Sequence, residues 1–378
     1  MNFIVACDSF KGTMTSEEAG LIIEDSIKNV DRKSLIKRLV ISDGGEGMLK
    51  SISKYIPGRF IEYEVHDAWF DPIKAPIYLI NNEDTVYIEM ASVAGYHLKD
   101  IHLNPELTTT LGVGELMRKS LDHHVKRIVV GCGGSATNDG GAGMMHALGV
   151  NFYDYDNKIF IPTGSTLQNI KSIDLSGLDP RAKAIEWIAM TDVSNPLVGD
   201  LGATRVYGPQ KGATSKMIET MEKAMIHFAK LMGDAIGRDD SKKKGSGAAG
   251  GLSFGLMSLL NAKIKSGISE MMDIIHLEDT IKDYDYLILG EGSLDEQSLQ
   301  GKTVIGMARR YKGKIKIIAV VGQSLGDKNI YLNEGIDLII ETNPNHLSFD
   351  LIKQHAKEDL SRTIMSWIRK IKKEVPHV

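Results

Sequence analysis

The sequence predicts an α/β protein in which one discontinuous domain is interrupted by a second domain. Apolar, β-branched runs alternate with helical patterns near both ends of the chain, whereas the middle has a different rhythm. Most glycine clusters stand where an apolar run ends and a helical pattern begins, as in the βα units of a parallel sheet. The 378 residues exceed the usual size of one domain and can form two cores.

The N-terminal segment has the pattern of two βα units. Residues 2–7 form an apolar run, and residues 15–18 have the spacing of a capping box ahead of a helix. Residues 35–41 form a second apolar run, which is followed by a glycine-rich stretch and by a helical pattern that stops at Pro57. Two successive units of this kind predict parallel strands.

The middle of the chain begins differently, because strand-like runs follow one another there without a helix. These runs lie at 60–66, 74–80 and 85–90. Adjacent strands of this kind predict a mixed sheet and therefore a second domain. Later in this region, helices are predicted at 112–123, 214–232 and 251–260, and strands at 127–130 and 187–190.

The C-terminal segment returns to regular alternation and ends in a long amphipathic helix at 350–373. Its buried-strand patterns lie at 284–289, 315–321 and 336–341. Because the two ends look alike, we expect residues 1–58 and 283–378 to form one α/β domain, with 59–282 inserted as the other. A cleft between the two domains is the expected place for an active site.

Composition and charge exclude several classes of protein. A net charge of −4 gives no long-range attraction for nucleic acid or for an anionic membrane. No apolar run approaches the roughly 20 residues of a membrane-spanning helix. The two cysteines, Cys7 and Cys132, cannot supply a disulfide framework. We therefore expect a cytoplasmic protein with reduced thiols and with neither nucleic-acid nor membrane partners.

Many of the 38 glycines gather in loops, most of which precede helical patterns. Backbone N–H groups converge in such loops and the helix dipole favours negative charge, so phosphate or carboxylate is the expected ligand. A tight turn explains any single loop equally well, but a series of them favours ligand binding. The loops span 8–12, 43–47, 131–143, 208–212, 245–251 and 290–292.

Most of these loops also carry an acid, an amide or a lysine. A carboxylate beside bound phosphate is unfavourable unless a divalent cation lies between them, and Mg²⁺ is usually held by one or two carboxylates plus phosphates. The pattern therefore suits phosphoryl transfer, in which cations neutralise the transferred group. The acids are Asp8, Asp43, Glu46, Asp139, Asp192, Glu291 and Asp295. The candidate cations are Lys11, Arg205, Lys211 and Lys302.

Two standard nucleotide-binding motifs fit poorly. Lys302 follows a glycine as in a P-loop, but Glu296 stands where that motif requires a second glycine. Residues 131–136 match the dinucleotide pattern, yet residues 138–141 prolong the loop and place a carboxylate where a pyrophosphate would lie. An NAD-dependent dehydrogenase therefore remains only as an alternative.

Several sequence blocks, in order along nearly the whole chain, resemble the bacterial type-1 glycerate kinases. The blocks are Asp8-Ser-Phe-Lys-Gly12, Asp43-Gly-Gly-Glu-Gly47, Glu89-Met-Ala-Ser92, residues 133–143, 195–197, 208–214, 247–251 and 290–292, with Asp295 and Gly301-Lys302. The resemblance implies ATP-dependent phosphorylation of D-glycerate, usually at the 2-hydroxyl. It also implies a flavodoxin-like domain with an inserted α/β domain. The chain departs from the family pattern at Cys7, at Ser293 and at residues 242–245.

On this resemblance we assign expected roles to individual residues. Catalysis is assigned to Asp192, which would orient or deprotonate the hydroxyl, with Lys11 and Asp8. Substrate binding is assigned to Ser9, Asn195, Arg205 and Lys211. Nucleotide binding is assigned to Gly133, Gly134, Ser135, Thr137, Gly290, Gly292 and Lys302. Magnesium binding is assigned to Asp43, Asp139, Glu291 and Asp295.

Besides the dehydrogenase, two alternatives stay open at the level of sequence. The same kind of kinase could act at the 3-hydroxyl of glycerate or on another small hydroxy acid. A non-catalytic regulator that binds an organic acid would use similar loops. The expected partners are D-glycerate and ATP, and a homodimer is left open.

Overall fold

The computed structural model divides into two compact units, each built around its own sheet. The terminal unit comprises Met1–Ser42 and Met271–Val378, and the central unit comprises Asp43–Glu270. The predicted α/β class, with one parallel and one mixed sheet, is confirmed. The structure describes residues 1–8, 10, 12–41, 44–82, 84–99, 103–295, 298–300, 303–343 and 349–374.

The terminal unit contains a five-stranded parallel sheet in the order β13-β12-β11-β1-β2. Its strands are β1 (Asn2–Cys7), β2 (Leu35–Val40), β11 (Tyr286–Leu294), β12 (Lys316–Ser324) and β13 (Leu338–Glu341). The chain adds β2 on one side of β1 and β11 to β13 on the other, so the strand order reverses between β1 and β11. This is the flavodoxin-like order, and ligands of such sheets bind at the point of reversal.

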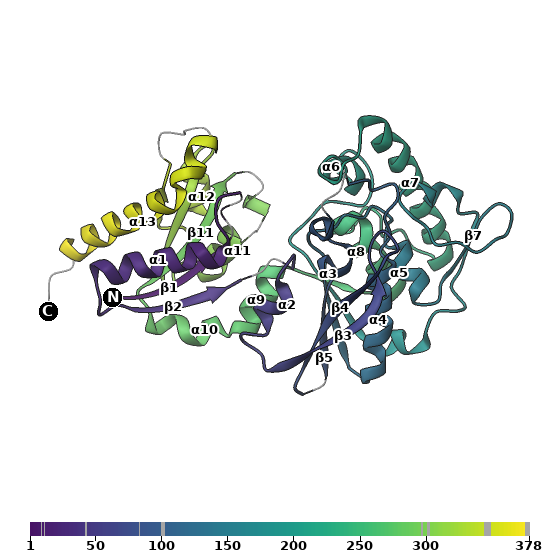
Figure 1. The fold of residues 1–378 in the computed structure, drawn as a ribbon, viewed down its shortest axis with the longest axis horizontal. Coiled ribbons are helices and arrows are strands. Elements are labelled where there is room, and N and C mark those ends of the chain that lie inside the picture. Colours follow the sequence, from purple (N-terminus) through teal and green to yellow (C-terminus); the bar gives the residue numbers. More distant parts are fainter. Residues whose placement is uncertain are drawn as a thin grey trace. The chain divides into compact units, whose positions relative to one another are not determined.

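Two helices cover one face of this sheet, α1 (Ser16–Val30) and α13 (Phe349–Glu374), and they lie side by side (Figure 1). Their buried residues, such as Ile23 and Ile364, share one apolar core with Val5 and Val320 of the strands. The predicted capping box begins α1. The other helices assigned mainly to this unit are α9 (Gly267–Ile275), α10 (Leu277–Thr280), α11 (Thr303–Tyr311) and α12 (Lys328–Asn333).

The central unit contains a six-stranded sheet in the order β10-β9-β6-β5-β4-β3. Its strands are β3 (Gly58–His66), β4 (Pro72–Ile80), β5 (Thr85–Glu89), β6 (Arg127–Gly131), β9 (Glu186–Met190) and β10 (Lys263–Lys265). The neighbouring strands β5, β6, β9 and β10 are parallel to one another. Strand β4 runs antiparallel to both of its neighbours, β3 and β5. The carboxyl ends of the parallel strands therefore meet at one edge. A separate hairpin pairs β7 (Asn151–Tyr153) with β8 (Ser172–Asp174).

The named helices of the central unit are α2 (Met48–Ile52), α3 (Ala91–Ala94), α4 (Leu111–Ser120), α5 (Ala142–Ala147), α6 (Ala203–Tyr207), α7 (Ser215–Ile236) and α8 (Ala248–Leu260). All of them except α2 and α6 contribute residues to one large apolar core. Within the described parts of the chain, no helix has both the length and the apolar character needed to cross a membrane.

Both unit boundaries lie earlier in the chain than the expected boundaries at 58 and 283. Near the first boundary, α2 joins the central unit because Glu89 of β5 accepts hydrogen bonds from the Gly47 and Leu49 amides. Near the second, Arg310 of α11 forms ion pairs with Asp273 and Glu278, which holds α9 and α10 to the terminal unit. Short helices therefore belong to the unit that supplies their polar partners.

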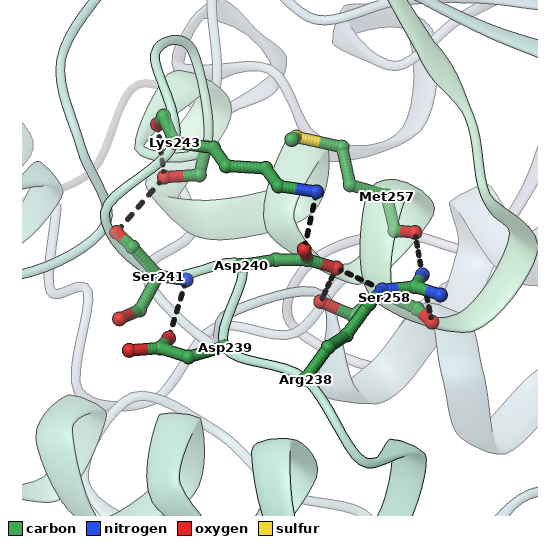
Figure 2. Close-up of polar contacts among 8 residues, drawn as sticks. Arg238, Asp239, Asp240, Ser241, Lys243, Met257 and Ser258 are labelled. Carbon is green, nitrogen blue, oxygen red and sulfur yellow. Dashed lines mark hydrogen bonds and ion pairs between the residues drawn. The ribbon is translucent and has the colours of Figure 1, made fainter.

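The loop between α7 and α8 is fastened by Asp240, whose side chain is 1% exposed. Its carboxylate accepts hydrogen bonds from Arg238 Nε at 2.9 Å and Ser258 Oγ at 3.2 Å, and Lys243 Nζ lies 2.6 Å away (Figure 2). Arg238 also donates to the carbonyls of Met257 and Ser258 in the last turn of α8, where a cation is favourable. Burial raises the pKa of Asp240, but the bonds from Lys243 and Arg238 lower it more, so the pKa lies below its usual value.

Asp240→Ala is expected to lower the free energy of unfolding by about 1.5–3 kcal/mol near neutral pH, because hydrogen bonds to a charged group are lost. A carboxyl with a lowered folded-state pKa stabilises the fold above its unfolded-state pKa of about 3.9, and this stabilisation is lost on acidification. The difference between wild type and variant should therefore shrink from about pH 5 to about pH 3. Urea unfolding at each pH measures the difference in the free energy of unfolding, with the exposed Asp234→Ala as the control. A difference that is constant across this range would contradict the prediction.

Candidate active site

Two glycine-rich loops contact each other at the carboxyl edge of the central sheet. Residues 44–47 precede α2, and residues 131–143 run from the end of β6 into α5. A Cβ atom at Gly131 would lie 2.6 Å from the Gly44 carbonyl oxygen, and one at Gly133 would lie 2.6 Å from Gly45 Cα. Only glycine allows this approach, so the two loops meet through their backbones.

Glu89, at the end of β5, holds the first loop in place. Its buried carboxylate accepts hydrogen bonds from the Gly47 amide at 3.0 Å and the Leu49 amide at 3.1 Å, where a helix N-terminus favours negative charge. Burial raises the pKa of Glu89, and these two bonds oppose that rise. Sequence reasoning gave Glu89 no role, although an acid at a strand end within one of the family blocks was an available signal.

The amides of Gly133 and Gly134 are two donors of the second loop that have no acceptor among the described residues. Both residues are partly exposed. Gly134 has φ 67°, a conformation that turns successive N–H groups toward one point. The Gly134 carbonyl accepts from the Tyr96 amide at 3.1 Å, which fixes the other side of the loop. The two glycines can therefore receive a phosphate or carboxylate oxygen.

Asp139 is fully buried and holds the same loop to the start of α4. One carboxylate oxygen accepts from the Thr110 amide, the Thr110 hydroxyl and the Gly143 amide, and the other accepts from the Gly141 amide, at 2.7–3.1 Å. Burial raises the pKa of Asp139, whereas these four bonds stabilise its ionised form. This geometry favours a structural role over the expected magnesium ligand.

Lys211 lies inside the central unit with 3% exposure, next to the same loop. Its Nζ donates hydrogen bonds to Ser135 Oγ at 2.8 Å and to the Thr137 carbonyl at 2.6 Å. Burial lowers the pKa of Lys211 to about 7, and the charge of Asp139 opposes that shift. The sequence predicted a lysine that binds substrate, but this ammonium contacts the loop itself.

The start of α8 supports the loop from another side through backbone contacts. Gly140 donates to the Gly250 carbonyl at 3.0 Å, and a Cβ at Gly250 would lie 1.9 Å from the Thr137 carbonyl oxygen. Asn138 is fully buried and donates to Thr204 Oγ1 at 3.0 Å. Among the described residues, Thr137 Oγ1 and Asn138 Oδ1 have no hydrogen-bond partner.

Asp192 follows β9 at the same edge of the sheet. Ser266, which follows the neighbouring strand β10, donates a hydrogen bond from Oγ to Asp192 Oδ1 at 2.5 Å. The bond fixes one carboxylate oxygen, the other oxygen is buried, and the residue as a whole is partly exposed. Sequence reasoning missed Ser266 because the three-residue run of β10 is too short to be recognised as a strand.

Arg205 and Asn195 are engaged within the fold. Arg205 pairs with Glu219 at 2.6 Å and so links α6 to α7. Asn195 donates to the Leu201 carbonyl at 2.8 Å and accepts from the Tyr207 hydroxyl at 2.8 Å. These contacts favour structural roles over the expected contacts with substrate.

The terminal unit gathers acids where its strand order reverses. Asp8 follows β1, and its Oδ2 accepts from Thr303 Oγ1 at 2.8 Å, a partner that sequence reasoning missed. In the neighbouring strand β11, Glu291 accepts from Ser298 Oγ at 3.3 Å. The Ser298 amide donates to Asp295 at 3.1 Å. Among the described residues, no group of three or more His, Cys, Asp or Glu side chains could hold a metal.

The expected loop at 290–292 is wrong, because these residues lie within β11 and pair with β12. A Cβ at Gly290 would lie 2.7 Å from Cys7 Sγ, so this glycine serves the close approach of β1 and β11. Four other predicted site residues, Ser9, Lys11, Asp43 and Lys302, lie outside the described residues.

Gly133→Ala should destabilise the central unit by roughly 1–3 kcal/mol, because the new methyl group would force the two loops apart. Gly20→Ala in α1 is the control, since its Cβ would have no neighbour closer than 3.6 Å. Thermal unfolding followed by circular dichroism measures both. Equal stability of Gly133→Ala and wild type would show that the loops tolerate a side chain.

Comparisons with known proteins place this chain in a family. The family model described as the glycerate kinase family matches residues 3–372. The chain is 38% identical to glycerate kinase of Bacillus subtilis (strain 168), over 96% of each chain. It is 36% identical to glycerate 2-kinase of Escherichia coli (strain K12), over 90% of each. A crystal structure assigned as glycerate kinase 2 of Salmonella typhimurium LT2 is 33% identical, with a TM-score of 0.78 over 99% of both chains. The chain belongs to the glycerate kinase family.

Proposed function

We propose that this protein is an ATP-dependent D-glycerate kinase that phosphorylates the 2-hydroxyl and releases 2-phospho-D-glycerate and ADP. The observation that carries the proposal is the pair of interlocked glycine loops, with the free amides of Gly133 and Gly134, in a chain of the glycerate kinase family. The name of the Escherichia coli relative, glycerate 2-kinase, supports the choice of hydroxyl. Because ATP is a cytoplasmic substrate, we infer a cytoplasmic enzyme.

Asp192 is the proposed acceptor of the hydroxyl proton. The residue is partly exposed at the edge of the sheet although its Oδ2 is buried, and the bond from Ser266 fixes its other oxygen, Oδ1. A base held in one orientation can align the substrate hydroxyl with the γ-phosphate, and positioning provides most of the catalysis in phosphoryl transfer. The Gly133 and Gly134 amides would meanwhile hold an anionic oxygen of glycerate or ATP.

Magnesium, when bound, would neutralise charge on the phosphates of ATP. Mg²⁺ takes oxygen ligands and is usually held by one or two carboxylates together with phosphates, which the acids of the terminal unit can provide. Asp8 and Glu291 would hold it, since Asp8 directly follows β1 and Glu291 lies in the neighbouring parallel strand β11. The reversal of strand order between those strands supports ATP binding there.

Four residues outside the described part of the chain keep their proposed roles from the sequence. Lys11 and Lys302 would neutralise phosphate, because cations beside the transferred group stabilise its transition state. Ser9 would contact the substrate, and Asp43 would assist with magnesium.

The proposed activity is tested by incubating the protein with D-glycerate, ATP and Mg²⁺. We expect ADP release in a coupled assay, and 2-phosphoglycerate as the product in NMR spectra. Formation of 3-phosphoglycerate would refute the assigned hydroxyl, and turnover of only another hydroxy acid would refute the substrate. Glycerate binding without ADP release would identify a regulator instead of an enzyme.

Asp192→Asn should lower kcat by about 100-fold or more, because an amide cannot accept the hydroxyl proton. KM for glycerate should change little, since the amide keeps the size of the carboxylate and can still accept the bond from Ser266. The exposed Asp234→Asn is the matched control and should retain wild-type kcat. Near-normal turnover of Asp192→Asn would remove Asp192 from the mechanism.

A further inference from the structure

We propose that the Ser135 hydroxyl donates a hydrogen bond to an anionic oxygen of the bound ligand, and that Lys211 is a positioning residue that directs this proton outward. This inference rests on the proposed function, which makes the oxygen part of the glycerate carboxylate or of an ATP phosphate. Lys211 thereby acts on the ligand through Ser135 and not by contact.

The direction of the Lys211–Ser135 hydrogen bond follows from the chemistry of the two groups. An ammonium carries three donors and no acceptor, whereas a hydroxyl can both accept and donate. At 2.8 Å from Lys211 Nζ, Ser135 Oγ must therefore accept. Its own proton turns away from the lysine, and among the described residues Ser135 Oγ has no acceptor for it. Burial lowers the pKa of Lys211 to about 7 and the charge of Asp139 opposes that shift, so the arrangement belongs to the protonated form of Lys211.

The position of Ser135 in the loop indicates what kind of ligand its hydroxyl binds. It directly follows Gly133 and Gly134, whose amides also have no acceptor in the described part of the chain. Three successive residues thus offer donors, and such a set is typical of a site for an oxyanion. Because the hydroxyl accepts from a cation, its own donated bond is polarised and strengthened.

The burial of Lys211 explains why it would act through another residue. With 3% exposure and a second bond to the Thr137 carbonyl at 2.6 Å, its ammonium cannot reach a ligand without giving up contacts. The two bonds also hold the loop on both sides of Ala136, so the Ser135 hydroxyl keeps one orientation.

The test compares Ser135→Ala, Lys211→Met and the double variant. Titration calorimetry with D-glycerate and with ADP measures each affinity without turnover, and steady-state assays separate KM from kcat. Ser135→Ala should weaken one of the two ligands by about 10- to 100-fold, the range for a hydrogen bond to a charged group. Lys211→Met should weaken the same ligand. The double variant should be within about 3-fold of Ser135→Ala, because residues that act as one unit are not additive. Exposed Lys230→Met of α7 is the control.

The outcomes separate the two sources of the oxygen. Weakened glycerate binding assigns the carboxylate, and weakened ADP binding assigns a phosphate. Unchanged affinities in Ser135→Ala would overturn the proposal, and this variant decides alone if Lys211→Met does not fold. If the two single variants lose affinity for both ligands equally, and the losses add up in the double variant, Lys211 has only a packing role. If wild type binds both ligands but releases no ADP, the proposed function fails while this test still stands.

Discussion

The backbone contact between two glycine loops is the constraint on which the central unit depends. Gly131 and Gly133 lie so close to Gly44 and Gly45 that neither Gly131 nor Gly133 has room for a Cβ atom. Glycine gives this approach but loses the most conformational freedom on folding. The unit compensates with hydrogen bonds to buried acids, Glu89 on one loop and Asp139 on the other. The positions of the Gly133 and Gly134 amides follow from that arrangement.

Stability alone does not account for the buried charges in the central unit. Taking Glu89, Asp139 and Lys211 out of water costs free energy, and apolar residues of similar volume often replace such groups without loss of stability. Each of these side chains instead orders backbone or hydroxyl groups of the same two loops. Their common effect is to fix donors and acceptors at the carboxyl edge of the sheet.

Much of the fold could be predicted because its strands are apolar runs whose ends coincide with glycine clusters. The loops at 44–47 and 131–143 were predicted for the same reason. The partners of charged side chains could not be predicted, since the sequence shows a charged residue but not which distant residue it contacts. Lys211 meets Ser135 across 76 positions, and Arg205 meets Glu219 on another helix. Gly290 looked like a loop residue because its close neighbour, Cys7 of β1, lies at the other end of the chain.

The discontinuity of the terminal unit also sets an order of events during synthesis. β1 lies between β2 and β11, and β11 is made only after the whole central unit. Until then the apolar strand β1 has a neighbour on one side only, and α1 lacks its packing partner α13. The central unit, whose contacts lie within one continuous stretch, can fold on the ribosome first. The residues of β1 and α1, which are translated before the central unit, thus reach their native environment only after it, and they stay exposed to chaperones and proteases while the central unit is made.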